Sequence, residues 1–144
     1  MKIECYIREA ENRDINFIKN SWQKNFASSM KHVPLQIYHK NQDKLITKLM
    51  GRSTCYVACN PEDFYQIFGW ILFDTLEDLG ILHYIYVKHP FRRYGIASVM
   101  LGLIKYDKSY PIIATHYSHG LDDLKKKFNI TFNPYFLLGD TYAY

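Results

Sequence analysis

The stretch that decides the fold is 81-ILHYIYVKHPFRRYGIASVMLGLI-104. It joins an aromatic, β-branched run, typical of a buried strand, to an apolar segment with the pattern of a buried helix. Arg92, Arg93 and Gly95 lie between the two. The first turn of a helix carries unpaired N–H groups, glycine lets the backbone approach a ligand closely, and arginine donates well to phosphate. The sequence therefore predicts an anion-binding loop here, suited to a pyrophosphate.

The rest of the chain alternates between strand and helix patterns. Strands are expected at 2–10, 53–60, 64–75, 81–87, 112–118 and 129–139, and the last of these is one strand or a pair, interrupted by Pro134. Helices are expected at 14–26, 34–50, 94–106 and 121–128, and the third is so apolar that we expect it to be deeply buried. The order is β-α-α-β-β-β-α-β-α-β. It predicts an α/β (mixed α+β) protein whose mixed sheet carries helices on its faces, in one domain spanning residues 1–144.

Composition narrows the class of protein. Of the 144 residues, 48% are hydrophobic and 22% charged, which is typical of a globular chain. The formal net charge of +4 fits an anionic ligand and is too weak to indicate nucleic acid without a basic patch. No leader pattern and no apolar run of about 20 residues is present, so we expect a cytoplasmic protein without membrane association. The three cysteines are expected to be free thiols.

The segment 84-YIYVKHPFRRYGIASVML-101 resembles the acetyl-CoA-binding motif of the GNAT acetyltransferase superfamily, roughly L-x-V-x-P-x-[Q/R]-x-x-G-x-[G/A]-x-x-L. The matching residues are Val87, Pro90, Arg92, Gly95, Ala97 and Leu101. The expected element order is similar to that superfamily over nearly the whole chain. The resemblance implies a GNAT acyltransferase fold and an acetyl-CoA-dependent N-acetyltransferase. The small size also resembles compact GNAT-like proteins of bacteriophages.

The resemblance implies a role for each part of the motif. The pyrophosphate of CoA would be held by the backbone N–H groups of Arg92, Arg93, Tyr94, Gly95, Ile96 and Ala97. The pantetheine arm would pair with the backbone at Tyr86 and Val87. The N–H of Ile85 would face the thioester carbonyl and stabilise the oxyanion formed on attack.

Acetyl transfer to an amine also needs a group that accepts a proton, because an alkylamine has a pKa near 10.4. The glutamate base of the histone-acetylating branch is matched by Ile81, so that base is missing. In the arylalkylamine N-acetyltransferase branch an H-x-H pair acts as the base, and the second histidine of that pair matches His83. Residues 81, 83 and 85 are expected on one strand face. His83 is therefore the candidate base, directly or through water; the alternative is a hydrogen-bonded, half-buried structural histidine.

Other candidate residues are less specific. In the superfamily, a tyrosine on the last helix usually protonates the leaving thiolate, and here lysine stands at that place. Tyr117 or a C-terminal tyrosine is the candidate replacement; the alternative is that these tyrosines are structural. Trp22 and Tyr38 lie where the superfamily binds its acceptor, although the helical spacing of Trp22 favours core packing. The lysines at 125–127 form either a solvated face or a contact to the 3′-phosphate of CoA. The spacing of the histidines predicts no metal site.

Three functions stay open at this level. The first is acetyl transfer from acetyl-CoA to a primary amine, on a small molecule or a protein, by direct attack. The second is a catalytically degenerate GNAT-fold binding or structural protein, of the bacteriophage type, that acts through a protein partner. The third and weakest is nucleic-acid binding through arginines, lysines and exposed tyrosines. The acceptor and the oligomeric state, including a homodimer, are left open.

Overall fold

The computed structural model describes residues 3–105 and 107–138. One six-stranded sheet has the order β1-β2-β3-β4-β5-β6. The strands are β1 (Tyr6–Glu9), β2 (Thr54–Asn60), β3 (Asp63–Leu76), β4 (Leu79–Val87), β5 (Ile112–Ala114) and β6 (Ile130–Phe132). The α-helices are α1 (Ile15–Phe26), α2 (Leu35–Met50), α3 (Ile96–Leu101) and α4 (His119–Leu124). The predicted order of elements and the mixed sheet are confirmed.

The sheet changes direction in its middle. Strands β1 to β4 pair antiparallel, and β4, β5 and β6 pair parallel. Short turns join β2 to β3 and β3 to β4, whereas α1 and α2 lie between β1 and β2. The parallel pairs need crossover connections, and α3 and α4 supply them. Both parallel pairings are only three residues long on β5. The β4–β5 pairing therefore stops well before β4 ends.

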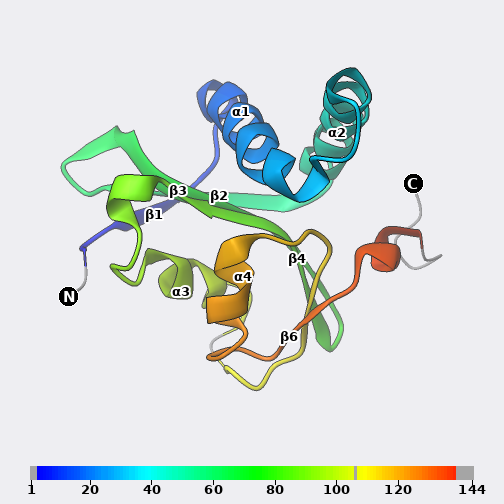
Figure 1. The fold of residues 1–144 in the computed structure, drawn as a ribbon. Helices are drawn as coiled ribbons and strands as arrows, with labels where there is room; N and C mark the ends of the chain where they lie inside the picture. The colour runs from blue at the N-terminus through cyan, green and yellow to red at the C-terminus, as the bar shows by residue number, and fades with distance from the viewer. Residues whose placement is uncertain (1–2, 106, 139–144) are drawn as a thin grey trace.

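Helices cover both faces of the sheet (Figure 1). One core lies under α1 and α2 and contains Ile18, Trp22, Ile46, Leu49 and Trp70, all fully buried. The other core lies under α3 and α4, where Met100, Leu101, Leu121 and Phe128 pack against the sheet. Side chains of β3 and β4 contribute to both cores, which is the pattern expected for central strands.

Several predicted element boundaries need correction. Helix α3 is six residues long where 94–106 was expected. The expected segment is not deeply buried throughout, because Val99 is 49% and Leu103 37% exposed. The strand expected at 112–118 ends at Ala114. The strand expected at 129–139 gives way at Pro134 to the 3-10 helix η4 (Pro134–Leu138), since proline cannot continue a ladder. Residues 2, 106 and 139 of these predictions lie outside the described residues.

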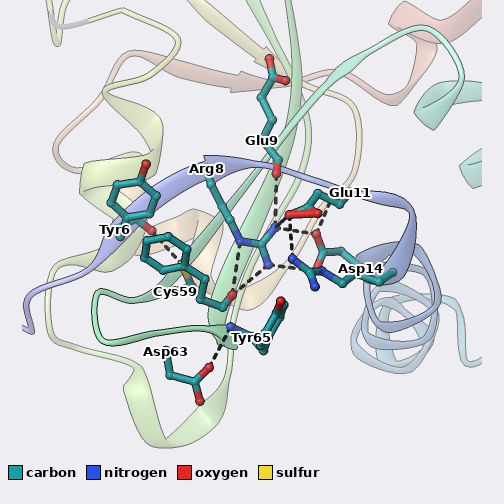
Figure 2. Close-up of polar contacts among 10 residues, drawn as sticks. Tyr6, Arg8, Glu9, Glu11, Asp14, Cys59, Asp63 and Tyr65 are labelled. Atoms are coloured by element: carbon teal, nitrogen blue, oxygen red, sulfur yellow. Dashed lines mark hydrogen bonds and ion pairs between the residues drawn. The ribbon is translucent and has the colours of Figure 1, made fainter.

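An arginine clasp fixes β1 to the start of α1 and to the β2–β3 hairpin (Figure 2). The Arg8 guanidinium donates to both carboxylate oxygens of Asp14, at 2.6 and 3.0 Å, and to the carbonyl of Phe64 at 3.0 Å. Asp14 also accepts from the backbone N–H of Glu11 at 2.7 Å. Both side chains of the Arg8–Asp14 pair are largely buried, with 9% and 4% exposure.

Three short 3-10 helices connect the larger elements: η1 (Asn12–Asp14), η2 (Ala27–Met30) and η3 (His89–Phe91). Segment η2 lies between the two helices that were expected at 14–26 and 34–50. All three cysteines are free. Within the two described ranges, no helix is both long enough and apolar enough to cross a bilayer.

Candidate functional site

A pocket of about 760 Å³ opens where β4 runs on without β5. The last backbone link between these strands is the bond from the Thr115 N–H to the Leu82 carbonyl, at 3.0 Å. Beyond it, β4 continues to Val87, while the chain after β5 turns away into α4. The pocket is lined by the end of β4, the loop before α3, the start and end of α4, and the end of α1.

The register of β4 directs backbone groups into this opening. The N–H of Lys88 donates to the Phe68 carbonyl, so the pairs 68/88, 70/86 and 72/84 are the hydrogen-bonded ones. The N–H and C=O groups of Ile85 and Val87 consequently point away from β3, toward the side that β5 has left. Ile85, Tyr86 and Val87 all line the pocket. An extended ligand can therefore pair with β4 as an added strand would.

The loop before α3 presents a row of backbone donors. Gly95 has φ 85°, a left-handed conformation that glycine adopts without strain, and it caps the helix. The first intrahelical bond runs from the Val99 N–H to the Gly95 carbonyl, at 3.1 Å. The N–H groups that precede Val99 in this first turn are those a helix leaves unpaired. Arg93 also has a positive φ, 70°, which tightens the same turn.

Basic side chains surround these donors. Arg92, Arg93, Lys126 and Lys127 all line the pocket, with Asp123 as an acidic neighbour. The Nε–H of Arg92 donates to the Val87 carbonyl at 2.7 Å, which folds this side chain back over the end of β4. The lysines come from the turn that follows α4, so two distant segments bring positive charge to one pocket. This arrangement favours an anion.

The structure brings most of the predicted cofactor residues together. Those that line the pocket are Ile85, Tyr86, Val87, Arg92, Arg93, Gly95, Ile96 and Ala97. Tyr94 is not among the lining residues; its carbonyl accepts from the N–H of Ile3 at 3.3 Å. The loop is thereby tied to the N-terminal segment.

His83 lies elsewhere than its strand position predicted. A β-bulge falls at this residue, because Leu72 pairs with Tyr84 while Phe73 pairs with Leu82. The extra residue breaks the two-residue alternation. Ile81 consequently packs in the core under α1 and α2, whereas Ile85 packs in the core under α3 and α4. The expectation that 81, 83 and 85 share one face is wrong, and His83 is fully buried and does not line the pocket.

His83 instead belongs to a buried chain of hydrogen bonds. Its Nε2 lies 3.1 Å from Asp74 Oδ2 and its Nδ1 lies 3.1 Å from Thr115 Oγ1. Thr115 Oγ1 continues to His116 Nδ1 at 3.0 Å, and His116 Nε2 meets Gln42 Nε2 at 3.2 Å. At one end of this chain the Gln42 amide donates to His116 Nε2, and at the other end the Asp74 carboxylate accepts from His83 Nε2.

Burial keeps the inner histidine uncharged. His116 is 7% exposed and packs edge-on against Phe26 and Trp22, with ring centroids 4.8 and 5.2 Å away. This burial, with a smaller contribution from the charge of His83, lowers the pKa of His116 to about 3. Among the described residues, no cluster of histidine, cysteine and carboxylate side chains is arranged to hold a metal ion.

Three further predicted residues lie outside the pocket lining. The Tyr117 hydroxyl donates to Asp122 Oδ2 at 2.5 Å, and this hydrogen bond raises its pKa. Trp22 is fully buried, and Tyr38 is 3% exposed with its hydroxyl on the Gln23 carbonyl at 2.6 Å. Both belong to the core under α1 and α2. This location corresponds to the core-packing alternative rather than to an acceptor-binding surface.

Part of the pocket lining has no signal in the sequence. Asn25, Ser28 and Ser29 contribute from the end of α1 and from η2, and Ser118 and Gly120 contribute from the start of α4. These are small polar residues of ordinary type, and no local pattern marks them. The lysines after α4 do have a signal in the sequence, a basic cluster that follows a short helix.

Comparison with known proteins supports the fold. No protein-family model and no curated sequence matches this chain. Among solved structures, a Pyrococcus furiosus protein assigned as an acetyl transferase is similar at TM-score 0.56 and 17% identity, covering 98% of this chain and 93% of that one. A Clostridium difficile 630 protein assigned as an acetyltransferase gives TM-score 0.54 at 16% identity, covering 90% and 93%.

A third solved structure carries the superfamily name. It is an acetyltransferase of the GNAT family from Staphylococcus aureus Mu50, with TM-score 0.50 and 12% identity, covering 70% of this chain and 64% of that one. At such identities the likeness concerns the fold alone. The chain has the GNAT acyltransferase fold.

Proposed function

We propose that this protein is an acetyl-CoA-dependent N-acetyltransferase that acetylates a primary amine by direct attack. One observation carries the proposal: the pocket beside the free end of β4 joins outward-facing strand backbone, a helix-start loop of N–H donors, and four basic side chains. A pantetheine arm needs the first of these, and a pyrophosphate needs the other two. The acetyltransferase-type structures of the same fold support this assignment.

The proposed reaction balances without another reactant. The amine nitrogen attacks the thioester carbonyl carbon, and the N–H of Ile85 stabilises the oxyanion. The C–S bond then breaks, giving the amide, and the amine proton ends on the CoA thiolate. Because His83 is buried and does not line the pocket, we assign it an indirect role in which it accepts the proton through water. Tyr117 stays a proposed acid for the thiolate.

The first test is thermal unfolding with acetyl-CoA. At a hundredfold excess over Kd, binding adds about 2.7 kcal/mol to the free energy of unfolding, a rise in Tm of roughly 5–10 °C. Arg92→Glu should abolish most of this rise, since it reverses a charge that lines the pocket. Lys44→Glu, at an exposed position on α2, makes the same charge change and should leave the rise intact. Absence of a rise in the unaltered protein would reject the cofactor.

A second function is favoured by the burial of His83. A pocket that binds CoA but whose predicted histidine base is buried outside the lining suits a catalytically degenerate binding protein that acts through a protein partner, as in the bacteriophage-type alternative. Release of free CoA thiol in the presence of a panel of small amines and lysine peptides separates the two functions. Turnover above the hydrolysis rate supports the enzyme, whereas binding without turnover supports the degenerate protein.

A further inference from the structure

We propose that Asn25 is a hydrogen-bond donor of the pocket for a carbonyl oxygen of the acyl-CoA ligand, and that Tyr84 holds its carboxamide in the required orientation. This inference rests on the proposed function. The carbonyl belongs either to the acyl thioester or to an amide of the pantetheine arm, which offer the same chemistry to a neutral donor.

Asn25 reaches the pocket from across the sheet. It lies in the last turn of α1, one residue before the buried Phe26, and it lines the pocket together with Ser28 and Ser29 of η2. The β4 residues Ile85 and Val87 line the same pocket. Helix α1 therefore brings one side-chain amide to the place where the strand backbone is free to pair with a ligand.

Tyr84 is a rigid anchor for this amide. Its side chain is 2% exposed and its ring stacks on Trp22, with centroids 5.3 Å apart and planes 18° apart. Trp70 and Phe26 pack around the same ring at 5.8 and 6.0 Å. Burial raises the pKa of the Tyr84 hydroxyl, so the group stays protonated at neutral pH. The aromatic cluster thus fixes an O–H that has to find an acceptor.

The acceptor is Oδ1 of Asn25, which forms a short hydrogen bond with the Tyr84 hydroxyl. The reverse orientation, with the amide nitrogen toward Tyr84, would make the hydroxyl an acceptor. Its own hydrogen would then lack a partner in a buried site, because no second hydrogen bond of Tyr84 occurs among the described residues. The hydrogen-bonding pattern therefore sets the direction of the carboxamide.

The amide nitrogen is left for a ligand. Within residues 3–105 and 107–138, no acceptor is hydrogen-bonded to Nδ2 of Asn25. A neutral N–H₂ group suits a carbonyl oxygen, whereas the charged phosphates are better matched by Arg92 and Arg93. An ammonium group has no lone pair to accept this bond. The carbonyls of an acyl-pantetheine chain lying along β4 are the acceptors of the proposed ligand that fit.

The decisive variant is Asn25→Asp, tested by acetyl-CoA titration. Aspartate has the same shape and still accepts from Tyr84, but at neutral pH it cannot donate. We expect Kd to rise at least tenfold while Tm without ligand changes little. Ser28→Asp adds the same charge on the same wall and measures the purely electrostatic effect. A larger loss for Asn25→Asp at both low and high salt supports the donor; equal losses in the two variants overturn it.

A thioether analogue identifies the carbonyl. S-ethyl-CoA keeps the pantetheine amides and lacks the acyl carbonyl. If Asn25 donates to the acyl group, Asn25→Asp weakens acetyl-CoA and leaves S-ethyl-CoA at the level of Ser28→Asp. If Asn25 donates to an amide of the pantetheine arm, Asn25→Asp weakens the binding of both ligands by the same factor, and this loss exceeds the one caused by Ser28→Asp. Binding by the unaltered protein with no extra loss for Asn25→Asp overturns this inference alone, whereas no binding by the unaltered protein overturns the proposed function and this inference together.

Tyr84 is tested as a positioning residue by a double-mutant cycle. Tyr84→Phe removes the orienting bond and should weaken acetyl-CoA binding severalfold in the unaltered background. In the Asn25→Asp background it should have no further effect, since the donor is already absent. Equal effects in both backgrounds would show that the Tyr84 hydroxyl acts on binding independently of Asn25 and would overturn its positioning role.

Discussion

His83 Nδ1 lies 3.1 Å from Thr115 Oγ1, and this contact joins the bulge of β4 to the residue that follows β5. It lies at the point where the two strands separate, directly after their last backbone bond. Thr115 is 3% exposed and also contacts His116 Nδ1 at 3.0 Å. One hydroxyl therefore bridges two buried imidazole rings at the point where β4 and β5 separate.

Thr115→Val tests the weight of this bridge. Valine keeps the shape of threonine but leaves one nitrogen of His83 and one of His116 without their bond. Losing the hydrogen bond of a buried polar atom costs about 1–3 kcal/mol, so for two such atoms we expect a loss of roughly 2–6 kcal/mol in denaturant unfolding. The control is Ser109→Ala, which removes an exposed hydroxyl bonded to Asp107 and should cost well under 1 kcal/mol. Equal stabilities for the two variants would show that the bridge contributes nothing.

The neutral His116 predicts a pH dependence of stability. Its pKa is lowered by burial to about 3 in the folded state, against an ordinary 6.5 in the unfolded chain. The unfolded state therefore binds the proton first, and stability falls as pH decreases from about 6.5 toward 3, by at most about 1.4 kcal/mol per pH unit. Urea unfolding between pH 7 and 4.5 measures this slope. His116→Gln should flatten it, and an unchanged slope would assign the effect to other groups.

The Arg8–Asp14 clasp should dominate the stability of the N-terminal part. Burial alone would raise the pKa of Asp14, but hydrogen bonds from Arg8 and from the Glu11 N–H, with nearby charges, lower it overall. Asp14→Asn leaves a largely buried guanidinium with only the more distant Glu11 carboxylate, at 3.7 Å, and should cost about 3 kcal/mol. Arg13→Gln breaks the exposed pair with Glu11, whose side chains are 48% and 50% exposed, and should cost under about 0.5 kcal/mol. Comparable losses would contradict the clasp.

The Asp14 carboxylate changes the stability in a lower pH range than His116 does. Because the folded pKa of Asp14 lies below its ordinary value, its stabilisation is present above about pH 4 and is lost as pH falls further. The two contributions can therefore be separated in one pH titration of stability, with Asp14→Asn changing only the acidic end.

The predictable parts of the site are those encoded locally. The loop from Arg92 to Ala97 needs a strand, a glycine and a helix start within a dozen residues, and all three are visible in the sequence. The bulge at His83 was not predictable, since it depends on how β3 and β4 align over their whole length. Asn25 could not be predicted either, because its place in the pocket follows from the packing of α1 on the sheet.

Gly69 is predicted to be indispensable for the approach of β3 to β4. A Cβ at this position would collide with the backbone carbonyl oxygen of Tyr86 and crowd the Met100 methyl group at 3.3 Å. Backbone cannot move aside as a flexible side chain can, so Gly69→Ala should lower the free energy of unfolding by about 2–3 kcal/mol or more. Gly120→Ala in α4 meets no atom within 4 Å and should be neutral or slightly stabilising in the same assay. Equal free energies of unfolding for the two variants would contradict the close contact between Gly69 and the Tyr86 carbonyl.

His83→Gln decides whether the buried histidine takes part in the proposed chemistry. Glutamine can retain hydrogen bonds to Asp74 and Thr115 but cannot accept a proton near neutral pH. If His83 accepts the amine proton through water, the variant should bind acetyl-CoA normally, as judged by its rise in Tm, while kcat falls at least a hundredfold and the pH profile loses its acidic limb. If His83 is only structural, Tm without ligand falls and kcat per folded molecule keeps both its value and its pH profile. That second result would remove His83 from the mechanism and favour attack by an amine that is already neutral when it binds.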